Sequence, residues 1–219
     1  DRDALAMDLT VQAYSGIMSI TGEPGSPPLK AGPAVVDFIS GTHLYSAVVT
    51  ALFARERSGE GRLVEVAMQD SVFPSLTSNL GLAHGGAVPR TGNRHGGLAI
   101  APYNVYEAKD GHVAVICVTE AHWRNLLKLM GREDLADDPR FIDNKSRTSN
   151  MAETDRLVEA WTRTMGKFEI YQATRACKLP SAPVRSLTEV IDDKSMHDRG
   201  MLVRIDHPEL GEIVLPHSP

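Results

Sequence analysis

Apolar side chains recur every three or four residues in several stretches of the chain, which is the spacing of one helix face. Asp37 stands where the N-cap of the second stretch is expected. Pro74 is tolerated only in a first helical turn, so the third helix is expected to start close to Asp70 or Ser71. Helices are therefore predicted over residues 6–21, 38–57, 72–82, 120–130, 151–164 and 167–177.

Alternating apolar and polar positions predict strands elsewhere. Residues 62–66 alternate like a short strand that leads into Asp70. Two hairpins are predicted, one around the Asp110–Gly111 turn and one over residues 201–215. Residues 180–185 are expected to be extended, and residues 187–199 to form short helices. Helices and strands together predict a mixed α/β chain.

A glycine-rich basic loop over residues 84–97 separates two regions of different pattern. Before the loop the order is helix, helix, strand, helix. After it, a hairpin is followed by a small helical cluster, as in a separate α+β module. The predicted division is a first segment over residues 1–85, a small domain over 86–200 and a return segment over 201–219.

Composition and charge exclude several classes of protein. The 219 residues are 42% hydrophobic and 23% charged, as in an ordinary globular chain. A net charge of −5 without a dense Lys/Arg run argues against nucleic-acid binding. No apolar run approaches the ~20 residues of a membrane span. Two cysteines sixty positions apart and eight histidines without ligand spacing predict no disulfide framework, no metal site and a reducing cytoplasm.

Asp70 is the strongest candidate for a catalytic residue. It lies at a strand-to-helix junction, where free helix N–H groups favour a carboxylate. A carboxylate can act as a nucleophile without first losing a proton to a partner base. The alternative is that Asp70 only caps its helix, and spacing alone favours capping.

The loop over residues 91–97 combines small residues, a cation and an imidazole. Successive backbone N–H groups in such a loop can hold an oxyanion or a phosphate. A flexible connection between domains is the alternative, and spacing alone favours it. The loop matches neither the phosphate-loop motif nor the dinucleotide fingerprint, and the chain has no GxSxG elbow.

Several segments together resemble one known family. In chain order they cover residues 21–25, 37–41, 54–61, 64–70, 92–95, 101–103 and 109–111. Their order and separations resemble the class III CoA-transferases, the CaiB–BaiF family of formyl-CoA transferase, carnitine CoA-transferases and α-methylacyl-CoA racemase. The resemblance spans essentially the whole chain, and residues 59–70 are its most specific part.

The resemblance implies a role for each candidate residue. Asp70 would attack an acyl-CoA thioester to give a mixed anhydride, and CoA thiolate would then give an aspartyl-CoA thioester. Substrate binding or a water-excluding flap would fall to Gln69, Asn93, Arg94, His95, Gly96 and Gly97. Acyl-CoA and a carboxylic acid would be the substrates, with no permanently bound cofactor and no metal.

The racemase branch is the main alternative. It pairs the aspartate with a histidine about thirty residues upstream, where this chain has Ser40, and His43 lies one helical turn further on. We therefore favour transfer over racemisation. Formyl-CoA transferase has an acidic residue near the position of Gly41, so a larger acceptor such as a dicarboxylate is expected here.

The resemblance also implies a fold and an assembly. The chain would be the C-terminal part of a two-domain fold, with the end of a Rossmann-like large domain followed by a small α+β domain. Two subunits would interlock as a homodimer. The chain begins on Asp1 without a methionine, which favours a piece of a longer protein that is weakly active or inactive alone. A non-catalytic folding or dimerisation module is the alternative.

Overall fold

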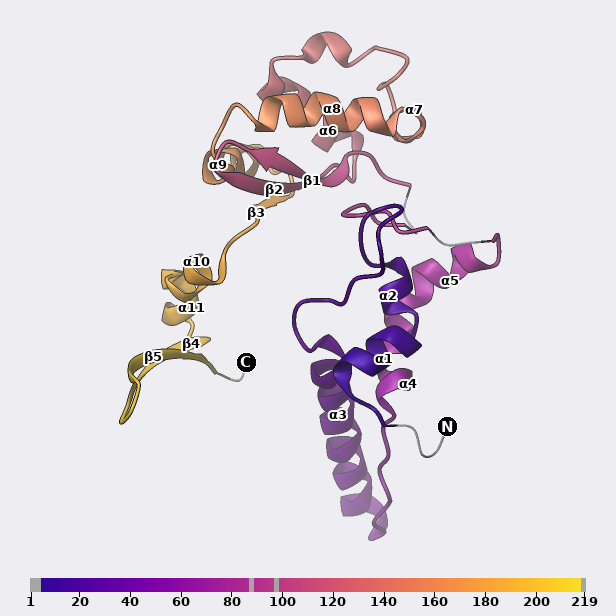
Figure 1. The fold of residues 1–219 in the computed structure, drawn as a ribbon, viewed down its shortest axis with the longest axis vertical. Helices are drawn as coiled ribbons and strands as arrows, with labels where there is room; N and C mark the ends of the chain where they lie inside the picture. The colour runs from indigo at the N-terminus through magenta and orange to yellow at the C-terminus, as the bar shows by residue number, and fades with distance from the viewer. Residues whose placement is uncertain (1–4, 87–88, 97–98, 218–219) are drawn as a thin grey trace. The chain divides into compact units, whose positions relative to one another are not determined.

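The structure is a computed structural model that describes residues 5–86, 89–96 and 99–217, and it mixes helices with two small sheets (Figure 1). The helices of the first half are α1 Asp8–Tyr14, α2 Ile17–Ile20, α3 Val35–Ser58, α4 Met68–Val72, the 3₁₀ turn η1 Phe73–Leu76 and α5 Thr77–Ala83. Those of the second half are α6 Glu120–Met130, η2 Glu133–Leu135, α7 Asn144–Ser149, α8 Met151–Thr162, α9 Lys167–Ala176, α10 Leu187–Ile191 and α11 Lys194–Asp198. The strands are β1 Tyr103–Ala108, β2 Gly111–Ile116, β3 Ser181–Pro183, β4 Leu202–His207 and β5 Gly211–Pro216.

The chain divides into two compact units. One unit combines residues 1–105 with 137–154, and the other combines residues 106–136 with 155–219. The candidate residues at 69–70 and 93–96 belong to the first unit.

The core of the first unit lies where α1, α3 and α4 meet. Val11, Val36 and Val72, one from each helix, are buried against one another. Ile17, Val35, Ile39 and Met68 pack around them. This cluster holds the start of α4 against the start of α3, and α4 carries Asp70.

The helix predicted over residues 6–21 is two helices. Gly16 has a φ of +94°, a left-handed conformation that suits glycine and interrupts the helical hydrogen bonds between α1 and α2. The apolar spacing continues across this break, so the pattern alone could not locate it.

The N-cap predicted at Asp37 is wrong, because α3 begins two residues earlier, at Val35. The Ala34 cap position makes no side-chain cap bond. Instead, the carboxylate of Asp8 in α1 accepts a 2.9 Å hydrogen bond from the backbone N–H of Val36. A carboxylate from another helix thus satisfies a free donor of the first turn.

Asp8 is the centre of a buried polar network. It accepts a 2.8 Å hydrogen bond from Nε2 of the fully buried Gln12 and pairs with Lys30 at 3.3 Å. Gln12 in turn accepts a hydrogen bond from the backbone N–H of Ala31. Burial raises the pKa of Asp8, but the bonds from Val36, Gln12 and Lys30 outweigh it and hold that pKa below its usual value.

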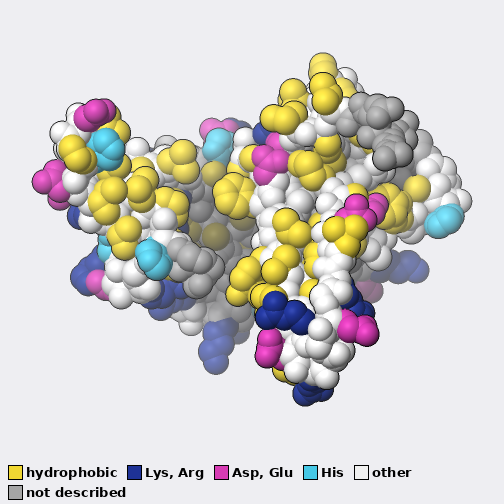
Figure 2. Space-filling view, turned by 90° about the horizontal axis from the view of Figure 1, so that it is seen from below, with side chains coloured by type: hydrophobic (Ala, Val, Ile, Leu, Met, Phe, Trp, Pro, Cys, Tyr) yellow, Lys and Arg dark blue, Asp and Glu magenta, His cyan; other side chains and the backbone are white. Residues whose placement is uncertain are grey.

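Helix α3 exposes apolar side chains for most of its length. The exposed large ones are Phe38, Leu44, Tyr45, Val48, Val49, Leu52 and Phe53. In the view from below, hydrophobic side chains gather on the surface around α3 (Figure 2). Three exposed hydroxyls of α3 bond to its own backbone: Thr42, Ser46 and Thr50 each donate to the carbonyl four residues earlier.

By length and composition alone, α3 could cross a membrane, so the prediction that no segment meets this criterion is wrong. Among the described residues it is the one helix that does so. A single helix of this kind is weak evidence for a membrane span, because the core helices of soluble proteins meet the same criterion.

The strand predicted over residues 62–66 is not formed. These residues are extended, but they pair with no strand in the described part of the chain. The side chains of Val64 and Val66 are half-buried, whereas those of Leu63 and Glu65 are exposed. The alternation is therefore real, and the missing element is a partner strand.

The second unit is built on the predicted first hairpin, which is confirmed. Strands β1, β2 and β3 form a sheet in that order, and β2 and β3 are antiparallel with Ala114 opposite Ala182. Helix α9 packs on β2 and β3, and α6 packs on α9. Its buried core includes Tyr106, Val113, Val115, Trp123, Leu126, Leu127, Val158 and Ile170.

The predicted C-terminal hairpin is also confirmed. Strands β4 and β5 pair in antiparallel register from Leu202–Pro216 to His207–Gly211. The predicted helices at 120–130, 151–164 and 167–177 correspond to α6, α8 and α9. Cys117 and Cys177 are free thiols.

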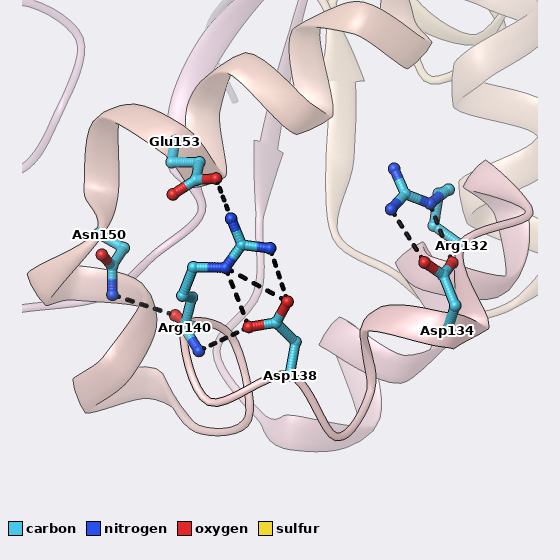
Figure 3. A network of polar contacts seen from close by, with 6 residues as sticks. All are labelled: Arg132, Asp134, Asp138, Arg140, Asn150 and Glu153. Carbon is cyan, nitrogen blue, oxygen red and sulfur yellow. Dashed lines mark hydrogen bonds and ion pairs between the residues drawn. The ribbon is translucent and has the colours of Figure 1, made fainter.

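Charged side chains fix the segment that precedes α8. Nε of Arg140 donates to Asp138 at 3.0 Å, and its Nη1 pairs with Glu153 (Figure 3). The Arg140 guanidinium lowers the pKa of Asp138 to about 2. Arg132 and Asp134 form a separate and more exposed ion pair (Figure 3).

Candidate active site

Asp70 is the third residue of α4, and it is exposed. The helix begins at Met68, two residues before the predicted start, so Asp70 does not occupy the N-cap position. That position belongs to Ala67, which has no side-chain cap bond. Asp70 is therefore not the N-cap of its helix, although spacing alone favoured that role.

Packing of α4 directs the candidate side chains outward. Ser71 and Val72 are buried, and the hydroxyl of Ser71 donates to the carbonyl of Ala67 at 2.9 Å. The preceding Gln69 and Asp70 are exposed on the other side of this turn. With the core anchored through Val72, the carboxylate of Asp70 lies at the surface of the first unit, beside the free N–H groups of the first turn.

An apolar pocket of about 680 Å³ adjoins Asp70 along the chain. It lies between α1 and the residues that lead into α4, and Gln69 lines it. The other lining residues are Leu5, Ala6, Thr10, Val11, Tyr14, Val66, Ala67 and Met68.

A second pocket of about 460 Å³ collects the basic residues of the predicted loop. Arg94, His95 and Gly96 line it together with Arg90. The remaining lining residues are Pro24, Leu82, Thr91, Ala99, Ile100, Thr148 and Met151. Within the described part of the chain, this lining set contains cations and hydroxyls but no carboxylate, so the pocket suits an anionic group.

Arg90, which sequence reasoning did not single out, anchors this loop. Its guanidinium donates to the carbonyl of Ser19 at 3.3 Å and to that of Ser26. The backbone N–H of Gly92 donates to the carbonyl of Gly22 at 3.1 Å. The acceptors are all main-chain atoms, so no residue type in the sequence marks them.

The structure brings some of the predicted residues together and leaves others apart. Arg94, His95 and Gly96 share one pocket, whereas Gln69 lines the other and Asn93 is exposed. Gly97, the second glycine of the predicted flap, lies outside the described residues.

The loop meets the helical run that carries Asp70. A Cβ at Gly96 would lie 3.5 Å from Nδ2 of Asn79, and Asn79 follows Asp70 by nine residues. At about 1.5–2.0 Å of rise per residue, that separation is at most ~18 Å. The loop therefore packs on the same helical run as Asp70, at most ~18 Å along it, rather than against Asp70 itself.

The upstream position that distinguishes the racemase alternative is buried. The Ser40 side chain on α3 is 9% exposed, and its Oγ has no hydrogen-bond partner among the described residues. His43, one turn along the same helix, is exposed. A buried hydroxyl at position 40 cannot replace an imidazole as a proton acceptor.

Metal-ligating side chains do not cluster in the described part of the chain. There, no group of three or more His, Cys, Asp or Glu side chains could hold an ion.

The sequence matches the family described as CoA-transferase family III over residues 1–219. This chain belongs to that family. Among its relatives is a succinyl-CoA:mesaconate CoA-transferase of Haloarcula hispanica, 36% identical over 218 residues that make up 98% of this chain and 54% of the relative. A formyl-CoA:oxalate CoA-transferase of Streptomyces avermitilis is 34% identical over 99% of this chain and 57% of its own length.

Solved structures agree with this assignment. A CaiB/BaiF family protein from Brucella suis superposes with a TM-score of 0.78 at 28% identity, covering 99% of this chain and 60% of its own. Rv3272 from Mycobacterium tuberculosis superposes with a TM-score of 0.83 at 25% identity, covering 99% of this chain and 57% of its own. The chain thus spans about half the length of the CoA-transferases it matches, as the predicted C-terminal part does.

Proposed function

We propose that this chain carries the nucleophile of a CoA-transferase that moves CoA from an acyl-CoA thioester to a free carboxylic acid. The observation that carries the proposal is the placement of Asp70. The residue is exposed in the first turn of α4, at the end of the most specific family segment, with the helix anchored beneath it. Membership in CoA-transferase family III supplies the reaction class.

The proposed chemistry begins with attack of the Asp70 carboxylate on the thioester carbonyl. The C–S bond breaks, CoA leaves as a thiolate, and a mixed anhydride of Asp70 and the acyl group forms. The thiolate then attacks the aspartyl carbonyl of the anhydride, which releases the donor acid as a carboxylate and leaves an aspartyl-CoA thioester.

The acceptor acid completes the cycle by the reverse sequence. Its carboxylate attacks the aspartyl thioester and expels the CoA thiolate, which gives a second mixed anhydride. The thiolate then attacks the acyl carbonyl of the acceptor, so acyl-CoA leaves and Asp70 regains its carboxylate. No external acid or base is consumed, because every leaving group is a thiolate or a carboxylate.

The basic loop supports a role in holding an anionic substrate. Arg94 and His95 line a pocket that suits an anion, and Gly96 lies close to Asn79 on the helical run that carries Asp70. In this proposal Gln69, Asn93, Arg94, His95 and Gly96, with Gly97 outside the described residues, bind substrate or form a flap. Such a flap would shield the anhydride from water.

For the acceptor we propose a dicarboxylic acid. This chain has Gly41 near the position at which formyl-CoA transferase has an acidic residue, so it has no carboxylate there. Relatives named for mesaconate and for succinate–glutarate transfer have dicarboxylic acids larger than oxalate in their names. We further propose that the protein forms a homodimer and is located in the cytoplasm. We also propose that domain boundaries lie at residues 85 and 200.

The test is a matched pair of variants. Asp37 is exposed and is the third residue of α3, so Asp37→Asn reproduces the position of Asp70→Asn in another helix. In the intact enzyme we expect Asp70→Asn to reduce transfer between succinyl-CoA and a dicarboxylate by more than about a thousandfold, with Asp37→Asn within a few fold of the parent. Full activity in Asp70→Asn would refute the proposal.

A second measurement identifies the intermediate. Enzyme incubated with acyl-CoA and then with hydroxylamine should carry a hydroxamate on Asp70, detected by peptide mass spectrometry. If deuterium from solvent instead enters the α-carbon of the acyl-CoA without any acceptor acid, the enzyme is a racemase.

A further inference from the structure

Lys178 stands at a helix end where glycine is the usual residue. It directly follows Cys177, the C-cap of α9, and its φ is +58°. The backbone N–H of Leu179 donates to the carbonyl of Thr174 at 2.9 Å, which is the bond that closes a helix through a left-handed residue. Among the described residues, Lys178 is the one residue other than glycine with a positive φ.

The left-handed conformation makes lysine an unfavourable residue at this position. A Cβ in this conformation crowds the neighbouring carbonyl, so glycine would end the helix with less strain. Helix α6 has the usual arrangement, with Gly131 at a φ of +64°. The Lys178 side chain is exposed and has no hydrogen bond or ion pair within the described residues, so the fold itself gives no reason for a lysine there. Strain of this kind is typical of positions at which a side chain has a function.

Other exposed cations surround this helix end. Nδ2 of Asn125 in α6 donates to the carbonyl of Cys177 at 2.9 Å, which joins the middle of α6 to the end of α9. Exposed cations flank Asn125 along α6, and others flank Cys177 along the chain. Together they form a basic patch on the second unit, which consists of Arg124, Lys128, Arg175 and Lys178.

The side chains of the basic patch have no partners within the described residues, either as hydrogen bonds or as ion pairs. Other exposed arginines of this unit do have partners, as Arg163 has in Glu107 at 2.7 Å. The helix dipole favours cations near a C-terminus, which accounts for Lys128 and Arg175. It accounts neither for Arg124, the fifth residue of α6, nor for a lysine where glycine is usual.

We propose that the basic patch binds an acidic peptide segment of another protein. Unpaired cations gathered on one exposed surface attract an anionic partner. The rest of the chain favours a short partner, since four of the 23 basic residues lie in the patch and the other 19 stand against 28 acidic residues. A long polyanion such as nucleic acid would therefore meet a negatively charged surface beyond the patch, whereas an acidic peptide can cover the patch alone.

The two kinds of cation would bind carboxylates in different ways. The guanidinium groups of Arg124 and Arg175 can each donate two parallel hydrogen bonds to one carboxylate, and the ammonium groups of Lys128 and Lys178 act as point charges. A single exposed pair contributes little to affinity. Binding should therefore depend on several cations of the patch at once and should weaken as salt is added.

The test uses an octaglutamate peptide labelled with fluorescein, whose binding to the intact enzyme is followed by fluorescence anisotropy. In low salt we expect Arg124→Glu/Lys178→Glu to weaken binding by more than about tenfold. Lys109→Glu/Lys145→Glu is the matched control, because it reverses two other exposed cations and changes the net charge equally. This control should bind within about twofold of the parent. The assay needs no acyl-CoA, so its result is independent of the proposed CoA transfer.

Two variants of Lys178 separate its charge from its backbone conformation. Lys178→Gly and Lys178→Ala both remove the cation, so both should weaken peptide binding by about threefold. Only Lys178→Gly also removes the left-handed strain, so it should melt a few degrees above Lys178→Ala. Thermal unfolding of the same enzyme preparations measures this difference.

Four results would overturn the proposal. The first two are an absence of peptide binding in the parent and an equal loss of binding in both double variants. The third is a Lys178→Gly variant that is no more stable than Lys178→Ala. The fourth is patch-dependent binding of single-stranded DNA or of phosphatidylserine vesicles that is tighter than binding of the peptide, which would identify nucleic acid or a membrane as the partner.

Discussion

The carboxylate of Asp8 accepts a 2.9 Å hydrogen bond from the backbone N–H of Val36, 28 residues later in the chain. This bond ties α1 to the first turn of α3, where the N-cap residue Ala34 makes no side-chain bond. Because Val36 also packs against Val72 of α4, the same contact helps to fix the helix that carries Asp70.

Loss of the Asp8 carboxylate is expected to destabilise the first unit. Asp8→Ala leaves the buried Nε2 of Gln12 and the N–H of Val36 without their acceptor, so the melting temperature should fall by several degrees. Asp37→Ala is the control, since Asp37 is exposed in the same turn and caps nothing. Thermal unfolding followed by circular dichroism measures both. An equal fall in the two variants would contradict the assignment of Asp8 as the cap.

The Asp138–Arg140 pair predicts a specific acid sensitivity. Arg140 lowers the folded-state pKa of Asp138 from 3.8 to about 2. A lowered pKa means that the stabilisation is complete above the unfolded value near pH 4 and is lost as the pH falls towards 2. Arg140→Ala should therefore melt below the parent at pH 7, and the difference should shrink as the pH approaches 2.

Arg132→Ala is the control for this pair. Asp134 is 62% exposed in its side chain and Asp138 only 18%, so solvent screens the Arg132 pair more strongly. We expect a smaller loss of melting temperature at pH 7. A difference for Arg140→Ala that does not change with pH would show that the arginine acts through packing alone.

Alanine substitutions at two glycines distinguish the destabilisation caused by backbone strain from that caused by a steric clash. Gly92 and Gly131 have φ angles of +62° and +64°, but a Cβ at Gly92 would lie 2.7 Å from Oε2 of Glu23, whereas Gly131 has open space. Gly131→Ala should lower the free energy of unfolding by about 1–2 kcal/mol, the cost of a left-handed alanine. Gly92→Ala should cost slightly more, because the exposed and flexible Glu23 side chain must move aside.

The Glu23→Ala/Gly92→Ala double variant tests the cause of that extra cost. Removing the Glu23 carboxylate should bring the loss at position 92 down to the level seen at position 131, as measured by urea unfolding. If the double variant is as unstable as Gly92→Ala, the carboxylate is not the obstacle.

Arg90 is expected to control the mobility of the segment that it clamps. Arg90→Met removes the bonds to the carbonyls of Ser19 and Ser26, so amide exchange over residues 19–26 should accelerate. Arg124→Met removes an exposed arginine of α6 and should leave that exchange unchanged. Unchanged exchange in Arg90→Met would mean that other contacts hold the loop.

Most helices and strands were predicted correctly, because turn residues and apolar spacing lie within the element that they specify. The Asp110–Gly111 turn fixes the first hairpin, and apolar spacing identifies α6, α8 and α9. The start of α3 could not be predicted, since its cap comes from Asp8 in another helix. The strand at 62–66 has the right pattern, but a strand needs a partner and the described chain supplies none.

The candidate site divides in the same way. Asp70 stands out because its segment resembles a family motif, and the structure places it in an exposed first turn. The contacts of Arg90 with the carbonyls of Ser19 and Ser26 could not be predicted, because main-chain acceptors have no sequence signature. Arg94 and His95 line the same pocket as Arg90.

The hydrogen bonds that three exposed hydroxyls of α3 make within the helix affect how polar its outer surface is to a binding partner. Thr42, Ser46 and Thr50 count as polar in any composition, yet each has already given its proton to a carbonyl within the helix. Stripping water from these three groups therefore leaves no orphaned donor behind. An apolar partner could therefore cover this surface of α3 at little cost in desolvation of the three hydroxyl groups.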